Sequence, residues 1–314
     1  MNPFSKIERT PFGKNWIFLN WLMTNHCNYR CSYCAPSLQM GPRQSLDIKL
    51  IENFLTRLAR DDKKLFVEFS GGEPTRIKEF PQILKMITQL GGKTLLISNG
   101  SAKLEWWKNN ASFLNIVQLS YHSEFVNVEH FKNVVNILKE AGVHIHISFM
   151  MKPDTFEEIL ETAKSLKEEV SCSMHLQPLR ADFAGMDRED FLYSPAQRKI
   201  MTHFKGRRAL TLENISINLK RLMIGYKGVI PTPLNLQRLE MNGQNSFQGW
   251  KCWAGIESFV INGEGDIYRG WCLEGGRIGS IFEDFNPDEI EPIICKKKFC
   301  DCRFDIHSKK IKEL

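Results

Sequence analysis

The sequence lacks any long apolar run. No segment of the 314-residue chain approaches the roughly 18 to 20 apolar residues that span a bilayer, and residues 1–14 are polar. We therefore expect neither a membrane helix nor a secretion signal, and we expect a cytoplasmic protein. A long tract of one charge is also missing, because the net charge of +6 is dispersed along the chain. This dispersion argues against nucleic acid as a partner.

Cysteine, by contrast, is plentiful: the chain has nine, and eight of them fall into two groups. A reducing compartment keeps thiols free, so such groups indicate metal or redox chemistry more than disulfides. The first group is a C-x₃-C-x₂-C run formed by Cys27, Cys31 and Cys34. Three crowded thiolates cannot all pair off, and they are one short of the closed set of structural zinc. A cubane held by three thiolates keeps one iron open, so we predict an iron–sulfur cluster here.

From Trp16 onward, short β-rich runs alternate with segments of helical periodicity, a pattern typical of βα units around a parallel sheet. The pattern predicts strands over residues 17–24, 65–70, 94–98, 116–121, 144–150 and 172–179. Ser45 is predicted to cap one helix, whose apolar stripe is Leu46, Leu50, Phe54, Leu55 and Leu58. Asp154 or Thr155 is predicted to open another. Periodicity does not separate a doubly wound sheet from a partial barrel, but in both the working end is the carboxyl edge of the strands.

Polar and apolar residues alternate along the last three predicted strands. The polar rows are Gln118, Ser120 and His122; His144, His146, Ser148 and Met150; and His175 and Gln177. In a barrel one face of each strand looks inward, so we predict that these rows line a lumen. The alternative is that these histidines and amides only satisfy one another in the core.

Gly71-Gly72-Glu73-Pro74 follows the second predicted strand. Glycine lets the backbone approach a ligand closely, although an ordinary strand-to-helix turn also uses it. Combined with the cysteine run and with Tyr33 directly before its last cysteine, this motif resembles the radical S-adenosylmethionine (SAM) superfamily. The resemblance implies an α/β fold with a partial (β/α)6 barrel. It also implies a [4Fe–4S] cluster on Cys27, Cys31 and Cys34 whose open iron chelates the amino and carboxylate groups of SAM.

The same resemblance implies the chemistry and its partners. Reductive cleavage of SAM yields a 5′-deoxyadenosyl radical that takes a hydrogen atom from a substrate, with an external one-electron reductant of the flavodoxin or ferredoxin type. The residues expected to contact SAM are Tyr33, Gly71, Gly72, Glu73, Pro74, Ser98, Asn99, Ser120 and Met150. Candidates for contact with the substrate are His122, His144, His146, His175 and Gln177.

The second group comprises Cys252, Cys272, Cys295, Cys300 and Cys302, with a hairpin predicted over residues 259–268. It is similar to the SPASM/twitch extensions of radical SAM enzymes, which carry auxiliary iron–sulfur clusters. Gly265 stands seven positions before Cys272 where the common pattern has five, and this favours a shorter twitch-like module with one auxiliary cluster. The expected ligands are Cys252, Cys272, Cys300 and Cys302, with Cys295 as an alternative. A structural zinc bound by four of these thiolates is the alternative to a cluster. Cys172 is predicted to be a buried structural thiol rather than a hydrogen donor.

We therefore divide the chain into an N-terminal extension (1–15), a barrel (16–190), a helical bridge (191–248) with helices near 194–203 and 212–223, and an auxiliary-cluster module (249–314). The short segment before the first strand leaves little room for a leader-peptide recognition domain, and this favours a small polar metabolite as substrate. The alternatives are a peptide- or protein-modifying maturase and, in another class, a non-catalytic iron–sulfur or zinc protein that binds or senses.

Overall fold

The computed structural model describes residues 6–7, 15–42, 46–59, 62–179, 191–204, 244–300, 303–306 and 308–312. Among the helices in these ranges, none is long and apolar enough to cross a membrane. The cysteines described there form no disulfides with one another.

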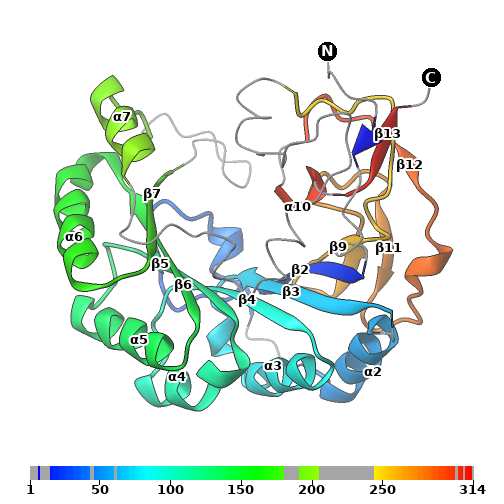
Figure 1. Cartoon of the computed structure of the whole chain (residues 1–314), viewed down its shortest axis with the longest axis horizontal. Helices are drawn as coiled ribbons and strands as arrows, with labels where there is room; N and C mark the ends of the chain where they lie inside the picture. Colours follow the sequence, from blue (N-terminus) through cyan, green and yellow to red (C-terminus); the bar gives the residue numbers. More distant parts are fainter. Residues whose placement is uncertain are drawn as a thin grey trace.

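A curved sheet forms the centre of the molecule, with strand order β11-β10-β9-β2-β3-β4-β5-β6-β7 (Figure 1). Its six consecutive parallel strands are β2 (Trp16–Thr24), β3 (Lys64–Gly71), β4 (Lys93–Ser98), β5 (Ile116–Tyr121), β6 (His144–Met151) and β7 (Ser173–Pro178). The order of these six never reverses, as it would in a doubly wound sheet. The six strands predicted from the sequence are confirmed, and the arrangement is singly wound and barrel-like.

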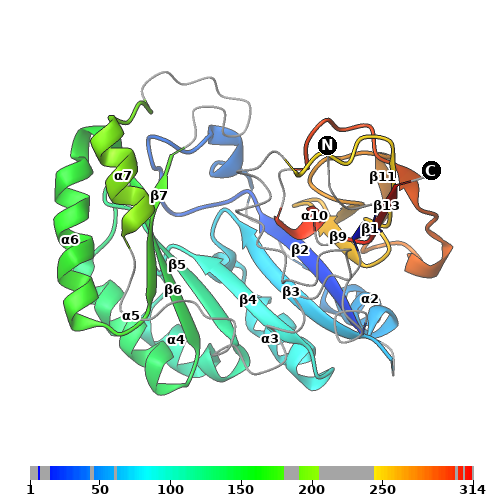
Figure 2. The same ribbon diagram turned by 45° about the horizontal axis from the view of Figure 1, so that its top comes forward.

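Five helices cover the outer face of these strands (Figures 1 and 2). They are α2 (Ile48–Leu58), α3 (Phe80–Gln89), α4 (Leu104–Asn110), α5 (Val128–Glu140) and α6 (Phe156–Glu169). The apolar rows of the strands, such as Val117, Leu119 and Ile147, are fully buried against the helix stripes. The predicted apolar row therefore packs outward, and the polar row is left to face inward.

Short elements complete this region. Single 3₁₀ turns cover Pro36–Leu38, Pro74–Arg76, Ala111–Phe113, Pro153–Thr155 and Pro287–Glu289. Helix α7 (Pro195–His203) begins with a capping box, because Ser194 and Gln197 each bond the backbone of the other. It matches the helix predicted near 194–203, whereas the one predicted near 212–223 lies outside the described residues.

The predicted hairpin over 259–268 is present as β9 (Ser258–Ile261) and β10 (Asp266–Tyr268), and β11 (Arg277–Ser280) extends it. Sequence reasoning missed that β9 pairs in parallel with β2, so the hairpin continues the barrel sheet. A second sheet, of order β1-β13-β8-β12, joins β1 (Lys6–Ile7), β13 (Lys310–Lys312), β8 (Trp250–Cys252) and β12 (Ile293–Ile294). Helix α10 (Arg303–Ile306) lies beside it in Figure 1.

Two local predictions about helices need correction. Asp47, not Ser45, is the N-cap of α2, and its carboxylate accepts bonds from the backbone of Lys49 and Leu50. Leu50 was predicted to face the core but is 39% exposed, because it lies about 100° around the helix from Ile51, which is fully buried. Thr155 precedes α6 as predicted, without a side-chain cap bond.

The two neighbouring positions on α2 provide a matched test of this correction. We expect Ile51→Ala to lower the free energy of unfolding by about 2–5 kcal/mol, because it leaves a cavity in the core. Leu50→Ala should change it by no more than about 0.5 kcal/mol. Chemical denaturation of both variants measures the difference, and equal losses would contradict the assigned helix face.

Candidate functional site

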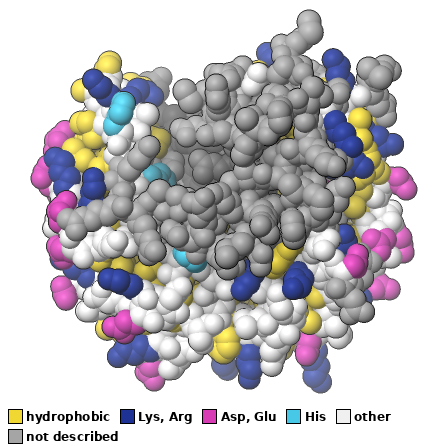
Figure 3. Space-filling view, viewed as in Figure 1, with side chains coloured by type: hydrophobic (Ala, Val, Ile, Leu, Met, Phe, Trp, Pro, Cys, Tyr) yellow, Lys and Arg dark blue, Asp and Glu magenta, His cyan; other side chains and the backbone are white. Residues whose placement is uncertain are grey.

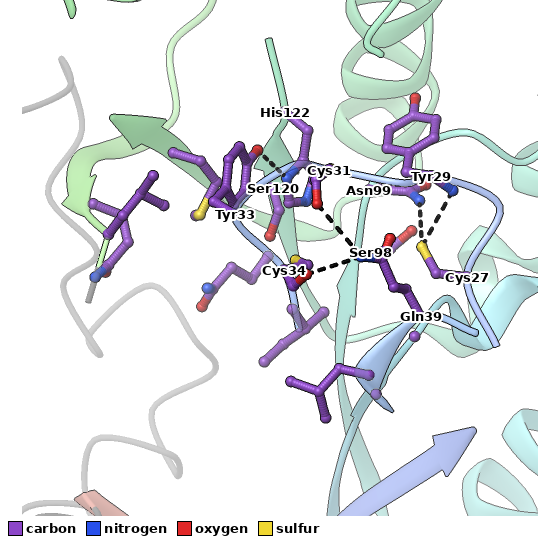
Figure 4. A pocket seen from close by; sticks show the side chains of 18 of the residues that line it. Cys27, Tyr29, Cys31, Tyr33, Cys34, Gln39, Ser98, Asn99, Ser120 and His122 are labelled. Atoms are coloured by element: carbon purple, nitrogen blue, oxygen red, sulfur yellow. Dashed lines mark hydrogen bonds between the residues drawn. The ribbon is translucent and has the colours of Figure 1, made fainter. Parts of the chain in front are cut away.

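A cavity of about 390 Å³ opens at the carboxyl ends of the parallel strands. Its lining comes from the cysteine loop, from the ends of strands β3 to β7 and from residues that follow β7 (Figure 4). The lining residues are Cys27, Tyr29, Cys31, Tyr33, Cys34, Leu38, Gln39, Gly71, Gly72, Ile97, Ser98, Asn99, Gln118, Ser120, His122, Met150, Gln177, Pro178, Leu179 and Phe191. Most side chains that the resemblance assigned to SAM therefore surround one space.

The loop that carries Cys27, Cys31 and Cys34, called the cysteine loop below, follows β2, and its two ends are hydrogen-bonded to each other. The amide of Cys27 donates to the carbonyl of Gln39 at 3.0 Å, and that of Gly41 donates to Asn25 at 2.8 Å. At the tip, the side-chain amide of Gln39 donates to the carbonyl of Cys34 at 2.9 Å. These bonds fix a closed loop whose three cysteines line one cavity.

The base of this loop crosses the end of β3 at the glycine pair. The amide of Gly72 donates to Thr24 at 2.6 Å, and that of Glu73 donates to His26 at 2.9 Å. A Cβ on Gly71 would lie 2.3 Å from the Thr24 carbonyl oxygen, and one on Gly72 would lie 2.2 Å from that of His26. Gly71 also has φ of +118°. The pair is therefore required for backbone crossing as well as for lining the cavity.

Glu73 does not line the cavity but lies beneath it, fully buried. Its carboxylate accepts bonds from Thr75 Oγ1 at 2.7 Å, from Ser98 Oγ at 2.9 Å and from the Asn99 amide at 2.7 Å. Burial raises its pKa, although these donors act in the opposite direction. Glu73 thus orients Ser98 and Asn99, and Pro74 opens the following 3₁₀ turn.

The tip of the loop is held from the other side of the cavity. Glu124 accepts bonds from the Ser32 amide at 2.7 Å and the Ser32 hydroxyl at 2.5 Å, and it pairs with Lys152 at 3.1 Å. Burial acts to raise the pKa of Glu124, but the bonds from Ser32 and Lys152 outweigh it and lower the pKa. Glu124 was not among the residues predicted from the sequence, although the polar row of β5, extended by one step past His122, ends at Glu124.

Tyr33 and His122 form a stacked pair at the cavity wall. The Tyr33 hydroxyl lies 2.7 Å from His122 Nδ1, and the ring centroids are 5.9 Å apart. Burial lowers the pKa of His122 to about 4, so the ring is neutral at pH 7 and its Nδ1 can accept the hydroxyl proton. His122 therefore orients the aromatic ring beside Cys34.

The three thiols have a donor set that suits a cluster. Cys27 Sγ receives the Tyr29 amide at 3.4 Å and the Asn99 side-chain amide at 3.7 Å. Burial raises the pKa of Cys27, while a bond from Cys31 lowers that of Cys34. Three soft ligands on one cavity, with amide donors to sulfur, fit a [4Fe–4S] cluster with one open iron.

The inward histidines divide into two sets. His122 and Gln177 line the cavity, whereas His144, His146 and His175 are not among its lining residues. His146 Nε2 lies 2.5 Å from His175 Nδ1, with ring centroids 4.6 Å apart and planes 14° apart. Because the nitrogens are much closer than the centroids, the rings meet edge to edge. This pair fits the alternative in which the histidines only hydrogen-bond one another in the core. Gln177 nevertheless connects the pair to the cavity, because its Oε1 lies 2.9 Å from His175 Nε2.

The second cysteine group also converges. Burial first, and then the charges of Asp305, Cys252 and Cys295, raise the pKa of Cys272. Burial likewise raises the pKa of Cys300 to about 12, and Cys252 contributes. These contributions indicate that Cys252, Cys272, Cys295 and Cys300 lie in one region, although among the described residues no group of three or more His, Cys, Asp or Glu side chains is arranged to hold a metal ion. Cys302 lies outside the described residues.

Two observations about the surroundings bear on these cysteines. Arg269 is buried beside them, and within the described chain its Nε has no hydrogen-bond partner. A buried cation of this kind fits an anionic metal–thiolate centre better than four neutral thiols. Cys172, in contrast, is 5% exposed within the core, where burial raises its pKa to about 12, as expected of a structural thiol.

On the face shown in Figure 3, basic and acidic side chains are interspersed along the rim of the described surface. Ion pairs such as Lys132–Glu169, at 2.5 Å, join charges of opposite sign on this protein. The dispersed charge inferred from the sequence is visible in this arrangement.

Residues 21–166 match the family model described as the Radical SAM superfamily, somewhat less than half of the chain. Among curated proteins, a "GTP 3′,8-cyclase" of Actinobacillus pleuropneumoniae is 34% identical over 94 residues, 28% of this chain and 27% of that protein. The mitochondrial "GTP 3′,8-cyclase" of Arabidopsis thaliana is 33% identical over 113 residues, 33% of this chain and 27% of that protein. The chain thus spans about a quarter of the length of these relatives.

Solved structures resemble the chain over a larger share. Streptococcus suis SuiB bound to S-adenosylmethionine has a TM-score of 0.57 at 15% identity, covering 88% of this chain and 65% of SuiB. The protein anSMEcpe, with bound AdoMet and the Kp18Cys peptide, has a TM-score of 0.54 at 16% identity, covering 85% of this chain and 78% of that protein. At these identities the likeness concerns the fold.

The role assigned to Glu73 can be tested by a change of one atom. We expect Glu73→Gln to lower the free energy of unfolding by about 1–3 kcal/mol, because an amide NH₂ replaces one of the two buried acceptor oxygens. Glu105→Gln, on the exposed face of α4, is the matched control and should be neutral. A Glu73→Gln variant as stable as this control would contradict the assignment.

The histidine pair predicts defined tautomers. Gln177 Nε2 donates to the Pro178 carbonyl at 3.0 Å, so its oxygen must accept from His175 Nε2. His175 Nδ1 then accepts from His146 Nε2, and His146 Nδ1 accepts from Ser173 Oγ at 2.7 Å. We expect both rings to carry the proton on Nε2 at neutral pH, as measured by ¹⁵N NMR of histidine-labelled protein. An Nδ1–H tautomer in either ring would disprove this chain of bonds.

Proposed function

We propose that this chain, which carries a radical SAM superfamily domain over residues 21–166, is a radical SAM enzyme that abstracts a hydrogen atom from a substrate C–H bond. The observation that carries the proposal is the meeting of Cys27, Cys31 and Cys34 with Gly71–Gly72 around one cavity. When bound, a [4Fe–4S] cluster supplies the electron that cleaves SAM to a 5′-deoxyadenosyl radical. The barrel-like sheet supplies orientation and keeps water from the reacting atoms.

The residues around the cavity have separate tasks in this proposal. Ser98, Asn99 and Ser120 offer polar groups to SAM, and Glu73 holds the first two in place. Tyr33 and Met150 provide an aromatic and an apolar surface for the adenine. Gln177 and His122 remain the candidates for contact with the substrate, because both line the same space.

We propose a small polar metabolite as substrate. The names of the curated relatives include GTP, which is such a molecule. A peptide is the second candidate, because the fold also resembles SuiB bound to the precursor peptide SuiA, with a TM-score of 0.55 at 17% identity. An external one-electron reductant of the flavodoxin or ferredoxin type completes the proposed system.

We further propose that the second cysteine group holds one auxiliary iron–sulfur cluster in a twitch-like module and supports oxidation or bond formation on the substrate. Cys252, Cys272 and Cys300 are the proposed ligands. Cys302 is the proposed fourth ligand, and Cys295, whose charge acts on Cys272, is the alternative. A structural zinc on the same thiols is the competing occupant.

Anaerobic reconstitution, dithionite reduction and detection of 5′-deoxyadenosine test the proposal. We expect the parent protein to form 5′-deoxyadenosine from SAM. Cys31→Ala should form it only at the background level, because a cluster ligand is gone. Cys300→Ala should still form 5′-deoxyadenosine but should no longer form the product of the substrate. Cys172→Ala, which removes a buried thiol outside the cavity, is the matched control.

Three outcomes would contradict parts of this scheme. A parent protein with a verified reducible cluster and no 5′-deoxyadenosine would favour the non-catalytic binding or sensing alternative. Iron near four atoms per chain, rather than the roughly eight of two cubanes, would remove the auxiliary cluster, and bound zinc would replace it. Equal loss of cleavage in folded Cys300→Ala and Cys31→Ala would refute the division between the two groups.

A further inference from the structure

Lys310 is buried at the second cysteine group, with 1% of its surface exposed. It lies directly opposite Cys252 in the antiparallel pairing of β13 with β8. Its ammonium donates to the carbonyl oxygens of Asp305, Ile306 and Ser308, the last two at 3.4 and 3.2 Å. These neutral oxygens satisfy its hydrogen bonds but leave its charge in the interior.

Arg269 is a second buried cation, 8% exposed. Its Nη1 donates to the Ala254 carbonyl at 3.2 Å, two residues beyond Cys252. Glycines make room for this side chain: a Cβ on Gly255 would lie 2.7 Å from Arg269 Cγ, and one on Gly275 would lie 2.8 Å from its Nε. The backbone is therefore shaped to hold a guanidinium here.

Among the described residues, two carboxylates lie near this group: Asp305 is 4% exposed, and Glu274, with a side chain 20% exposed, pairs with Lys297 at 3.7 Å. Burying a cation is costly, so further negative charge close to Lys310 and Arg269 stabilises the fold. Thiolates bound to a metal provide it, because four thiolates exceed the positive charge of a [4Fe–4S] core. Lys310 and Arg269 both interact electrostatically with Cys252.

We propose that Arg269 and Lys310 compensate the charge of the auxiliary centre and raise its reduction potential. The inference rests on the proposed function, because it takes that centre to be an iron–sulfur cluster. Reduction adds one negative charge to the cluster, and fixed positive charges in a medium of low dielectric constant favour the form that carries it. Neither residue needs to be a ligand to have this effect.

The test uses the full-length chain carrying Cys27→Ala, Cys31→Ala and Cys34→Ala, so that only the second group binds a cluster. Its midpoint potential is measured by a dithionite titration followed by electron paramagnetic resonance. We expect Lys310→Met and Arg269→Met each to shift the midpoint to a more negative value. Lys309→Met is the matched control, because Lys309 lies over the Trp253 ring at 4.1 Å and is only partly buried, and it should leave the midpoint unchanged.

Charge-retaining variants separate electrostatics from packing. Lys310→Arg and Arg269→Lys should keep the parent midpoint, and if Lys310→Met does not fold, Arg269→Met decides the question. An unchanged or more positive midpoint in the iron-loaded Met variants overturns the inference alone. A parent site that binds zinc, or no iron, overturns instead the auxiliary-cluster proposal on which it rests.

Discussion

The close crossing of the cysteine loop over the end of β3 is the constraint on which the candidate site depends. Thr24 and His26 accept backbone bonds from Gly72 and Glu73, and the space at both glycines is already filled by the carbonyl groups of the loop. Any side chain there has to push the loop off the sheet. The position of the loop is therefore set by the strands β2 and β3, rather than by the hydrogen bonds within the loop.

Once the loop is fixed, two carboxylates hold it from opposite sides. Glu73 acts from beneath, through Asn99, whose side-chain amide reaches Cys27 Sγ. Glu124 acts from across the cavity, through Ser32. Because each works through an intermediate residue, neither occupies the space that a ligand needs. The arrangement explains how an acidic motif residue serves the site without lining it.

Local sequence patterns predicted the strands and most of the cavity lining, because period-two alternation and cysteine spacing are properties of neighbouring residues. Two features depended on distant pairing and were not predictable in this way. The parallel pairing of β9 with β2 and the contact of Glu124 with Ser32 each join segments far apart in the chain. The prediction that Leu50 faces the core was wrong for another reason: the sequence pattern does not show at which residue a wide apolar stripe ends.

The two cysteine groups differ in their charged neighbours. Burial, and then the charge of Glu73, raise the pKa of Cys27. Burial also raises the pKa of Cys300, to about 12, where the charge of Lys310 acts against the increase and that of Asp305 adds to it. Under the proposed function, an anionic neighbour such as Glu73 would disfavour an added electron at the first group and make a cluster there a stronger reductant. A cationic neighbour such as Lys310 would have the reverse effect at the second group.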